Sequence, residues 1–183
     1  MVWTDRGSDL GGETFAGITR KNWWKETKEL WAAIDACKGY SDFPSVLERP
    51  AMQEKLAPLV EAFYRTYFWD AANLGLLEDQ DIANEVYDTG VNCGANPAVR
   101  FLQEGVWALN FGTNIPTPIV DGNLGPKTAA SVNALCKNTQ MKKALLVDLN
   151  IRQGVWYQAI IRRNPAQRAN YRGWVINRIG EDL

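Results

Sequence analysis

Apolar residues recur every three or four positions along most of the chain, which is the spacing of one face of an α-helix. This spacing predicts seven helical segments, at residues 20–38, 50–67, 81–93, 97–109, 126–135, 141–163 and 167–179. We expect Thr19 to cap the first segment, and we expect Pro50 and Pro126 to begin the second and the fifth. Pro58 lies inside the second pattern, so we expect it to split or kink that helix.

Three stretches lack helical periodicity and are predicted to connect the helices. Residues 1–19 are rich in glycine and are expected to be irregular, and residues 40–49 form a connector. Residues 110–125 carry repeated Gly and Pro and predict a loop, with at most a short extended piece at 115–120. Because no strands alternate with these helices and no segment repeats, the predicted fold class is all-α, with about six to seven helices.

The length and the charge of the chain argue against several classes of protein function. The chain has 183 residues and a mass of 20.5 kDa, which is the size of one domain or two small ones. Its net charge of -1 gives no basic surface for a polyanion, so we expect no nucleic-acid partner. No apolar run approaches the roughly 20 residues of a membrane span, so no stable membrane insertion is expected. The first residues turn polar at once and predict no signal peptide.

Histidine is absent from the sequence, and this absence constrains the chemistry most. It excludes Ser-His-Asp and Cys-His catalysis and any metal site that needs an imidazole, so acid–base chemistry must come from other side chains. The sequence has no nucleotide-binding glycine motif and no Cys-x-x-Cys, and we expect no metal and no cofactor. Its three cysteines are odd in number and widely spaced, which favours free buried thiols and cytoplasmic synthesis.

Eight tryptophans are the other outlier of the composition. Tryptophan suits protein cores, and its flat apolar ring also covers the C–H face of a sugar. The stretch from Tyr67 to Asp70 holds one of them, Trp69, at the end of a helical stripe. A core position is the favoured interpretation for Tyr67 and Phe68. The stretch from Tyr171 to Trp174, with Arg178, is expected to pack the last helix.

A glycine-rich stretch near the start of the chain could carry chemistry. It reads Asp-Leu-Gly-Gly-Glu-Thr from Asp9 to Thr14, with Asp5 just before it and Gly17 just after. Paired glycines let the backbone come close to a ligand, so such a turn could hold the carboxylate of Asp9 or Glu13 beside a bound sugar. An ordinary loop with solvated acids explains the same residues, and the spacing alone favours that interpretation.

A second glycine-rich stretch runs from Val120 to Thr128, downstream of Gln103. It contains an Asp-Gly turn, a further glycine and a proline that begins a helix. We expect Asp121 to accept backbone N–H hydrogen bonds at a packing corner.

The ordered set of motifs resembles the glycoside hydrolase family 108 N-acetylmuramidases. The pattern Asp-x-Gly-Gly-x-Thr-x-x-Gly-Ile matches residues 9–18, and an aromatic Tyr-x-Trp-Asp pattern matches residues 67–70. An Asp-x-x-Val-Asn-x-Gly helix matches residues 88–94. Leu-Gln at 102–103, Asp-Gly-x-x-Gly-Pro-x-Thr at 121–128 and Gly-Trp-x-x-x-Arg at 173–178 resemble the family's C-terminal predicted peptidoglycan-binding region. The likeness covers essentially the whole chain.

This resemblance implies a lysozyme-like, mostly helical fold that acts on bacterial peptidoglycan. Residues 1–93 would form the glycosidase region, and residues 94–183 a helical peptidoglycan-binding region packed on it. The implied reaction is hydrolysis of the β-1,4 bond between N-acetylmuramic acid and N-acetylglucosamine. Asp9 and Glu13 are the candidate catalytic carboxylates, and we expect Thr14, Tyr67, Trp69 and Asn92 to contact sugar.

One departure from the family concerns its catalytic acid. In the family this acid is the Glu of a Glu-Gly-Gly-aromatic motif about ten residues before the Asp-x-Gly-Gly pattern, and this sequence contains no Glu-Gly-Gly. Three explanations stay open. The sequence could be truncated, another acid (Glu13, then Asp9 or Asp5) could replace the glutamate, or the protein could bind glycan without cleaving it.

The resemblance also leaves alternatives for function and location. A non-catalytic peptidoglycan-binding or secretion-accessory protein would use the same glycan-facing residues, and a helical protein–protein adaptor would bury all its tryptophans. The substrate lies outside the inner membrane, so we expect action in the periplasm or at the cell wall after export or release. That release implies a holin-like or secretion-system partner.

Overall fold

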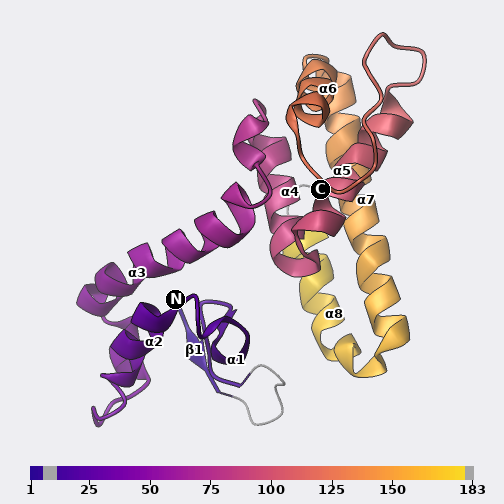
Figure 1. Cartoon of the computed structure of the whole chain (residues 1–183). Coiled ribbons are helices and arrows are strands. Elements are labelled where there is room, and N and C mark those ends of the chain that lie inside the picture. Colours follow the sequence, from indigo (N-terminus) through magenta and orange to yellow (C-terminus); the bar gives the residue numbers. More distant parts are fainter. Residues whose placement is uncertain (6–11, 180–183) are drawn as a thin grey trace. The chain divides into compact units, whose positions relative to one another are not determined.

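The computed structural model describes residues 1–5 and 12–179 of the chain. These residues belong to two compact units, Met1–Thr66 and Tyr67–Leu183 (Figure 1). The predicted all-α class is confirmed, because helices dominate both units and the described strands form only one small sheet.

A three-stranded antiparallel sheet opens the first unit, in the order β1 (Trp3–Thr4), β2 (Thr14–Phe15) and β3 (Ile18–Thr19). Thr14 pairs with Thr19, and Phe15 pairs with Ile18. The prediction that residues 1–19 are irregular is therefore wrong for the described part of this segment. Its physical reason is a two-residue turn in which Ala16 and Gly17 both have positive φ, at 48° and 80°, as a tight hairpin requires.

The side chain of Tyr64 holds the hairpin turn in place. The Tyr64 hydroxyl donates a hydrogen bond to the Ala16 carbonyl oxygen at 2.8 Å. Phe15 and Ile18 on either side of the turn are fully buried. A Cβ atom at Gly17 would lie 2.6 Å from the Tyr64 hydroxyl oxygen, so the turn needs glycine for its space as well as for its φ.

The helices of the first unit are α1 (Arg20–Trp23), α2 (Lys28–Asp35), the 3-10 turn η1 (Ser45–Glu48) and α3 (Pro50–Tyr64). The single helix predicted for residues 20–38 is interrupted after Trp23, where the Thr27 hydroxyl bonds the Trp23 carbonyl. Thr19 precedes α1 but makes no side-chain capping bond, so that detail of the prediction is wrong. Pro58 is exposed, and α3 continues through it without a break.

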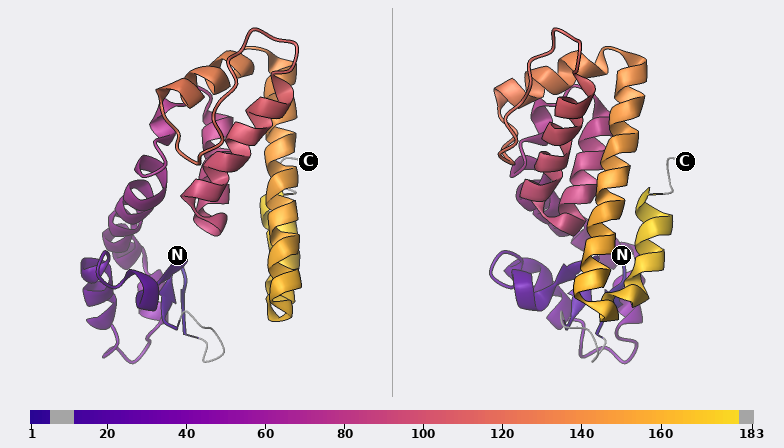
Figure 2. Two further views of the ribbon diagram at one scale, coloured as in Figure 1. Left: turned by 45° about the vertical axis from the view of Figure 1, so that its right-hand side comes forward. Right: turned by 90° about the vertical axis from the view of Figure 1, so that its right-hand side faces the viewer.

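The second unit is built on three helices that pack against one another, α4 (Gln80–Cys93), α5 (Ala95–Leu109) and α7 (Thr139–Arg163) (Figures 1 and 2). Each occupies a segment predicted from the apolar spacing. Short helical turns η2 (Arg65–Asp70) and η3 (Leu74–Leu76) precede α4. The helix α6 (Pro126–Cys136) packs on α5 and α7, and η4 (Pro165–Gln167), α8 (Arg168–Trp174) and η5 (Val175–Ile179) turn back along α7. No strand forms at residues 115–120.

One continuous apolar core holds the second unit together. Its members on α4 and just before it include Leu74, Ile82 and Val86, and all three are almost completely buried. They meet core residues of α5, α6 and α7: Val99, Leu102, Val106, Val132, Leu135, Leu145 and Leu149. Trp174 stacks on Tyr157 with ring centroids 4.9 Å apart, which confirms the predicted packing role of the last helix.

The three cysteines form no disulfide in the structure. Cys37 is buried, whereas Cys93 and Cys136 are partly buried. Burial raises the pKa of the Cys93 thiol to about 12 and that of the Cys136 thiol to about 11. Among the helices that the structure describes, none is both long and apolar enough to cross a membrane.

The hairpin turn generates a stability prediction. Replacing Gly17 by Ala should lower the free energy of unfolding by about 1–3 kcal/mol, because the new Cβ meets the Tyr64 hydroxyl and strains a positive φ. Gly39→Ala is the matched control, since a Cβ there meets nothing within 4 Å. Urea unfolding followed by tryptophan fluorescence measures both variants. Equal midpoints for the two would show that the turn does not need its glycine.

Candidate functional site

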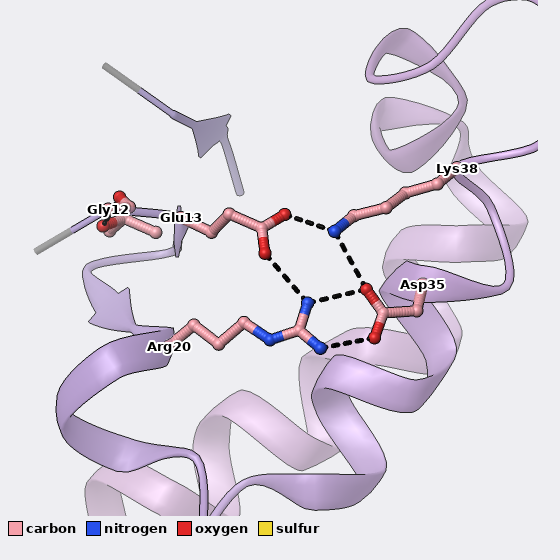
Figure 3. Close-up of polar contacts among 6 residues, drawn as sticks. Gly12, Glu13, Arg20, Asp35 and Lys38 are labelled. Carbon is pink, nitrogen blue, oxygen red and sulfur yellow. Dashed lines mark hydrogen bonds and ion pairs between the residues drawn. The ribbon is translucent and has the colours of Figure 1, made fainter. Parts of the chain in front are cut away.

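The glycine-rich stretch ends in a cluster of four alternating charges (Figure 3). Arg20 Nη1 lies 2.9 Å from Glu13 Oε2, and the same guanidinium group bonds both Asp35 carboxylate oxygens at 2.7 and 2.5 Å. Lys38 Nζ closes the ring at 2.5 Å from Glu13 Oε1 and 3.0 Å from Asp35 Oδ1. Two cations and two carboxylates therefore tie the segment after Gly12 to the first and second helices.

The surroundings strengthen this cluster. The Arg20 guanidinium lies 4.7 Å from the centre of the Trp24 ring and 5.3 Å from that of Trp31, within cation–π range. Its double hydrogen bond to Asp35 holds the pKa of that carboxyl down at about 2. The neighbouring Glu13 carboxylate is the main cause that raises the pKa of Lys38.

Both oxygens of the Glu13 carboxylate are occupied, one by Arg20 and the other by Lys38. The side chain is only 19% exposed, so it points into the cluster rather than into open solvent. The backbone is held as well, because the Arg20 N–H donates to the Glu13 carbonyl at 2.8 Å. This geometry makes Glu13 a fastening point for the glycine-rich segment.

The other predicted residues of this segment differ in how they are placed. The Thr14 hydroxyl donates to the Gly12 carbonyl at 3.1 Å and so stabilises the turn itself. Asp5 is exposed. Asp9 lies outside the described residues.

Of the residues predicted to contact sugar, Thr14 belongs to the first unit. The other three, Tyr67, Trp69 and Asn92, belong to the second unit. Tyr67 is 36% exposed, so the expectation that it is a core residue is wrong. Trp69 is partly buried against the core and lies 5.8 Å from the Tyr87 ring on α4. The Asn92 amide donates to the Asp88 carbonyl of its own helix at 2.9 Å, which leaves its side-chain oxygen for other partners.

A buried glutamine organises the second glycine-rich stretch. Gln103 on α5 is fully buried, and its side-chain oxygen accepts the N–H groups of Asp121 and Gly122 at 3.0 and 2.8 Å. Its side-chain nitrogen donates to Asp121 Oδ1, to the Asn123 carbonyl and to the Thr128 hydroxyl. One amide on a helix thus fixes five groups of the loop.

Asp121 accepts a backbone N–H, as predicted. Its Oδ1 atom receives the Asn123 N–H at 2.8 Å together with the Gln103 amide at 2.9 Å. These two hydrogen bonds, the Gln103 bond first, hold the pKa of the Asp121 carboxyl below its ordinary value. The packing-corner interpretation is confirmed, and the carboxylate itself remains exposed.

The chain matches two protein families. Residues 2–94 match the family described as glycosyl hydrolase 108, and residues 97–179 match the one described as a predicted peptidoglycan domain. The chain belongs to the glycosyl hydrolase 108 family. No curated protein matches it.

The glycosyl hydrolase 108 match and the peptidoglycan match are joined inside the second unit. Arg178 of η5 forms an ion pair with Asp88 of α4, so the last motif of the sequence meets the motif at residues 88–94. Gln153 on α7 donates to the other Asp88 oxygen at 3.3 Å. Asp88 is thereby held by two residues from the peptidoglycan-domain match.

No group of three or more Cys, Asp or Glu side chains is placed to hold a metal ion within residues 1–5 and 12–179.

Sequence reasoning did not find the partners of Glu13. The motifs in the sequence include none of Arg20, Asp35 and Lys38. Asp35 and Lys38 are three residues apart, a spacing that brings side chains together on a helix. This spacing was the one indication in the sequence that these two residues could pair. Nothing in the sequence indicated that Glu13 would lie against them, because that contact depends on the hairpin.

The ion-pair cluster predicts a pH dependence. The folded Asp35 pKa of about 2 is below the ordinary value of 3.8, so this carboxylate adds stability above pH 4 and loses that contribution as the pH falls through 2. Arg20→Met removes the largest cause of the shift, whereas Lys38 remains beside Asp35. The variant should be less stable at neutral pH, and its stability should fall less steeply between about pH 4 and pH 2.

Free energies of unfolding measured at several pH values test this expectation. Lys25→Met is the control, because Lys25 is an exposed cation of the same region and is not a member of the cluster. If the free energy of unfolding fell equally steeply between about pH 4 and pH 2 for Arg20→Met and for the parent protein, Arg20 would not be the largest cause of the low Asp35 pKa.

The buried glutamine predicts a second effect. Gln103→Met should lower the free energy of unfolding by about 1–3 kcal/mol, because the Asp121 and Gly122 N–H groups lose their acceptor. Amide hydrogen exchange should accelerate at these two positions. Gln140→Met is the control, since that side chain is exposed. Unchanged exchange at Asp121 and Gly122 would show that Gln103 does not hold the loop.

Proposed function

We propose that this protein is an N-acetylmuramidase that hydrolyses the β-1,4 bond between N-acetylmuramic acid and N-acetylglucosamine in bacterial peptidoglycan. The observation that carries the proposal is the tandem of a glycosyl hydrolase 108 match and a peptidoglycan-domain match in one chain. In this proposal residues 1–93 form the hydrolase region and residues 94–183 the peptidoglycan-binding region.

Hydrolysis of a glycosidic bond needs a proton for the leaving oxygen and a negative charge near the anomeric carbon. Usually two carboxyl groups share these tasks. Glu13 has both oxygens engaged by cations in the described structure, which supports a positioning role for it in this proposal. Asp9, in the same family motif, is the carboxylate we assign to charge stabilisation or substrate orientation.

In this proposal each unit offers its own candidate sugar contacts, Tyr67, Trp69 and Asn92 in the second unit and Thr14 in the first. The exposed Tyr67 ring and the partly exposed Trp69 ring offer apolar faces for a pyranose. The free side-chain oxygen of Asn92 can accept a hydrogen bond from a sugar hydroxyl or an acetamido N–H. Thr14, whose hydroxyl hydrogen is used by Gly12, can still accept one.

A second candidate function is peptidoglycan binding without cleavage, in a wall-binding or secretion-accessory role. It is favoured by two observations, the engaged Glu13 carboxylate and the absence of Glu-Gly-Gly from the sequence. Under either function we propose cytoplasmic synthesis and action in the periplasm or at the cell wall. A holin-like or secretion-system partner would deliver the protein there.

Product analysis of digested peptidoglycan tests the proposed function. The parent protein should release new reducing-end muramic acid, and Asp9→Asn should lower the rate about 100-fold or more, in the range of a lost group that stabilises transition-state charge. Glu26→Gln, which removes an exposed carboxylate of the same unit, should leave the rate unchanged. Unchanged turnover by Asp9→Asn would remove Asp9 from the mechanism.

Retention on insoluble cell wall, measured beside the digestion, separates the two candidates. Retention with no new reducing ends supports the binding function and overturns the muramidase proposal. New reducing ends on N-acetylglucosamine instead of muramic acid would assign the other glycosidic bond. Neither retention nor products would overturn both functions.

A further inference from the structure

A groove of about 840 Å³ lies in the second unit, between the segment after α5 and the first turns of α6. One wall consists of residues 116–119, and the other includes Pro126, Ala130 and Ser131. Lys127 and Asp121 also line it. All of these residues fall within the peptidoglycan-domain match, yet none belongs to the sugar contacts proposed above.

The irregular wall of the groove is held in place by α5. The Asn110 amide donates to the Ile115 carbonyl at 3.0 Å and to the Thr117 hydroxyl at 2.9 Å. Arg100 donates to the Val120 carbonyl at 3.1 Å, and Gln103 fixes the residues that follow. The wall is therefore pre-organised, so a ligand need not order it on binding.

The backbone of this wall suits an extended peptide. Thr117 and Ile119 alternate with two prolines, and within the described residues their N–H groups have no hydrogen-bond partner. Two N–H groups spaced two residues apart match the carbonyl spacing of an extended chain. Ile119 is 78% exposed and offers an apolar contact beside them.

The charges of the groove select the kind of peptide. Lys127 is exposed and has no ion pair among the residues described, so it is available to a carboxylate. The Asp121 carboxylate is exposed in the lining of the groove, where an amine can reach it. A ligand with small side chains, carboxylates and one amine complements this surface.

No aromatic side chain lines the groove, which argues against stacking of a pyranose ring there. We propose that the groove binds the stem peptide of peptidoglycan in an extended conformation, with Lys127 on a peptide carboxylate and Asp121 on the amine of its diamino acid. This inference rests on the proposed function and adds a peptide-binding site to it. The protein would then bind the wall through its peptides as well as its glycan.

Titration of the full chain with a synthetic lysine-containing stem tetrapeptide tests this site. Binding should shift the NMR amide signals of Thr117 and Ile119. Lys127→Glu should weaken the binding about tenfold or more, because a charge-assisted hydrogen bond becomes a repulsion. Lys137→Glu, at the other end of α6, makes the same charge change outside the groove and should leave the affinity unchanged.

Equal affinities for the Lys127→Glu variant and the parent protein would overturn the site. So would signal shifts at Thr117 and Ile119 caused by peptide-free glycan strands and not by the peptide. The muramidase assay reports separately on the proposed function. Cleavage of peptidoglycan without tetrapeptide binding would overturn only the peptide-binding site in the groove. Tetrapeptide binding without cleavage would overturn only the muramidase proposal.

Discussion

The burial of one helix constrains the whole second unit. The helix α4 belongs to the glycosyl hydrolase match, but its apolar residues Ile82 and Val86 are covered by α5 and α7 from the peptidoglycan-domain match. Removing α5 and α7 would expose that apolar face to water. The ion pair between Asp88 and Arg178 joins the same two matches at the surface. The boundary between the two family matches is therefore not a boundary between folding units.

Whereas apolar side chains form the core, polar side chains on or next to helices hold in place the segments that have little regular structure. Arg20 and Lys38 fasten Glu13 after the glycine pair, and Gln103 fastens the loop around Asp121. In both places a helix supplies the fixed groups and the glycine-rich segment supplies the backbone. Loops held in this way present their remaining side chains with little loss of conformational entropy on binding.

The helices were predictable because their apolar spacing is strong. The segments of α4, α5, α6 and α7 follow from it, and Pro126 begins α6 as its fixed φ suggests. The hairpin of β2 and β3 was missed because each strand has only two residues, too few for an alternating pattern. The break after Trp23 was missed because Thr27 continues the helical stripe in sequence while its hydroxyl bonds back to Trp23.

The candidate site was predictable only in part. The motif placed Glu13 and Thr14 near one another, but the contacts of Glu13 depend on residues brought by folding. The role of Asp121 followed from local turn chemistry, and the structure agrees. Gln103 was noticed in the sequence as part of a motif, but its burial and its contacts with the loop come from the packing of α5.

The half-buried thiols have a consequence for how the folded chain responds to an oxidising solution. Disulfide formation requires the thiolate, and at pH 7 a pKa of about 11 leaves roughly one Cys136 thiol in ten thousand ionised. The thiolate fraction of Cys93 is smaller still. Cys37, for its part, is covered by the core of the first unit. We therefore expect Cys93 and Cys136 of the folded chain to form disulfides only slowly in an oxidising solution.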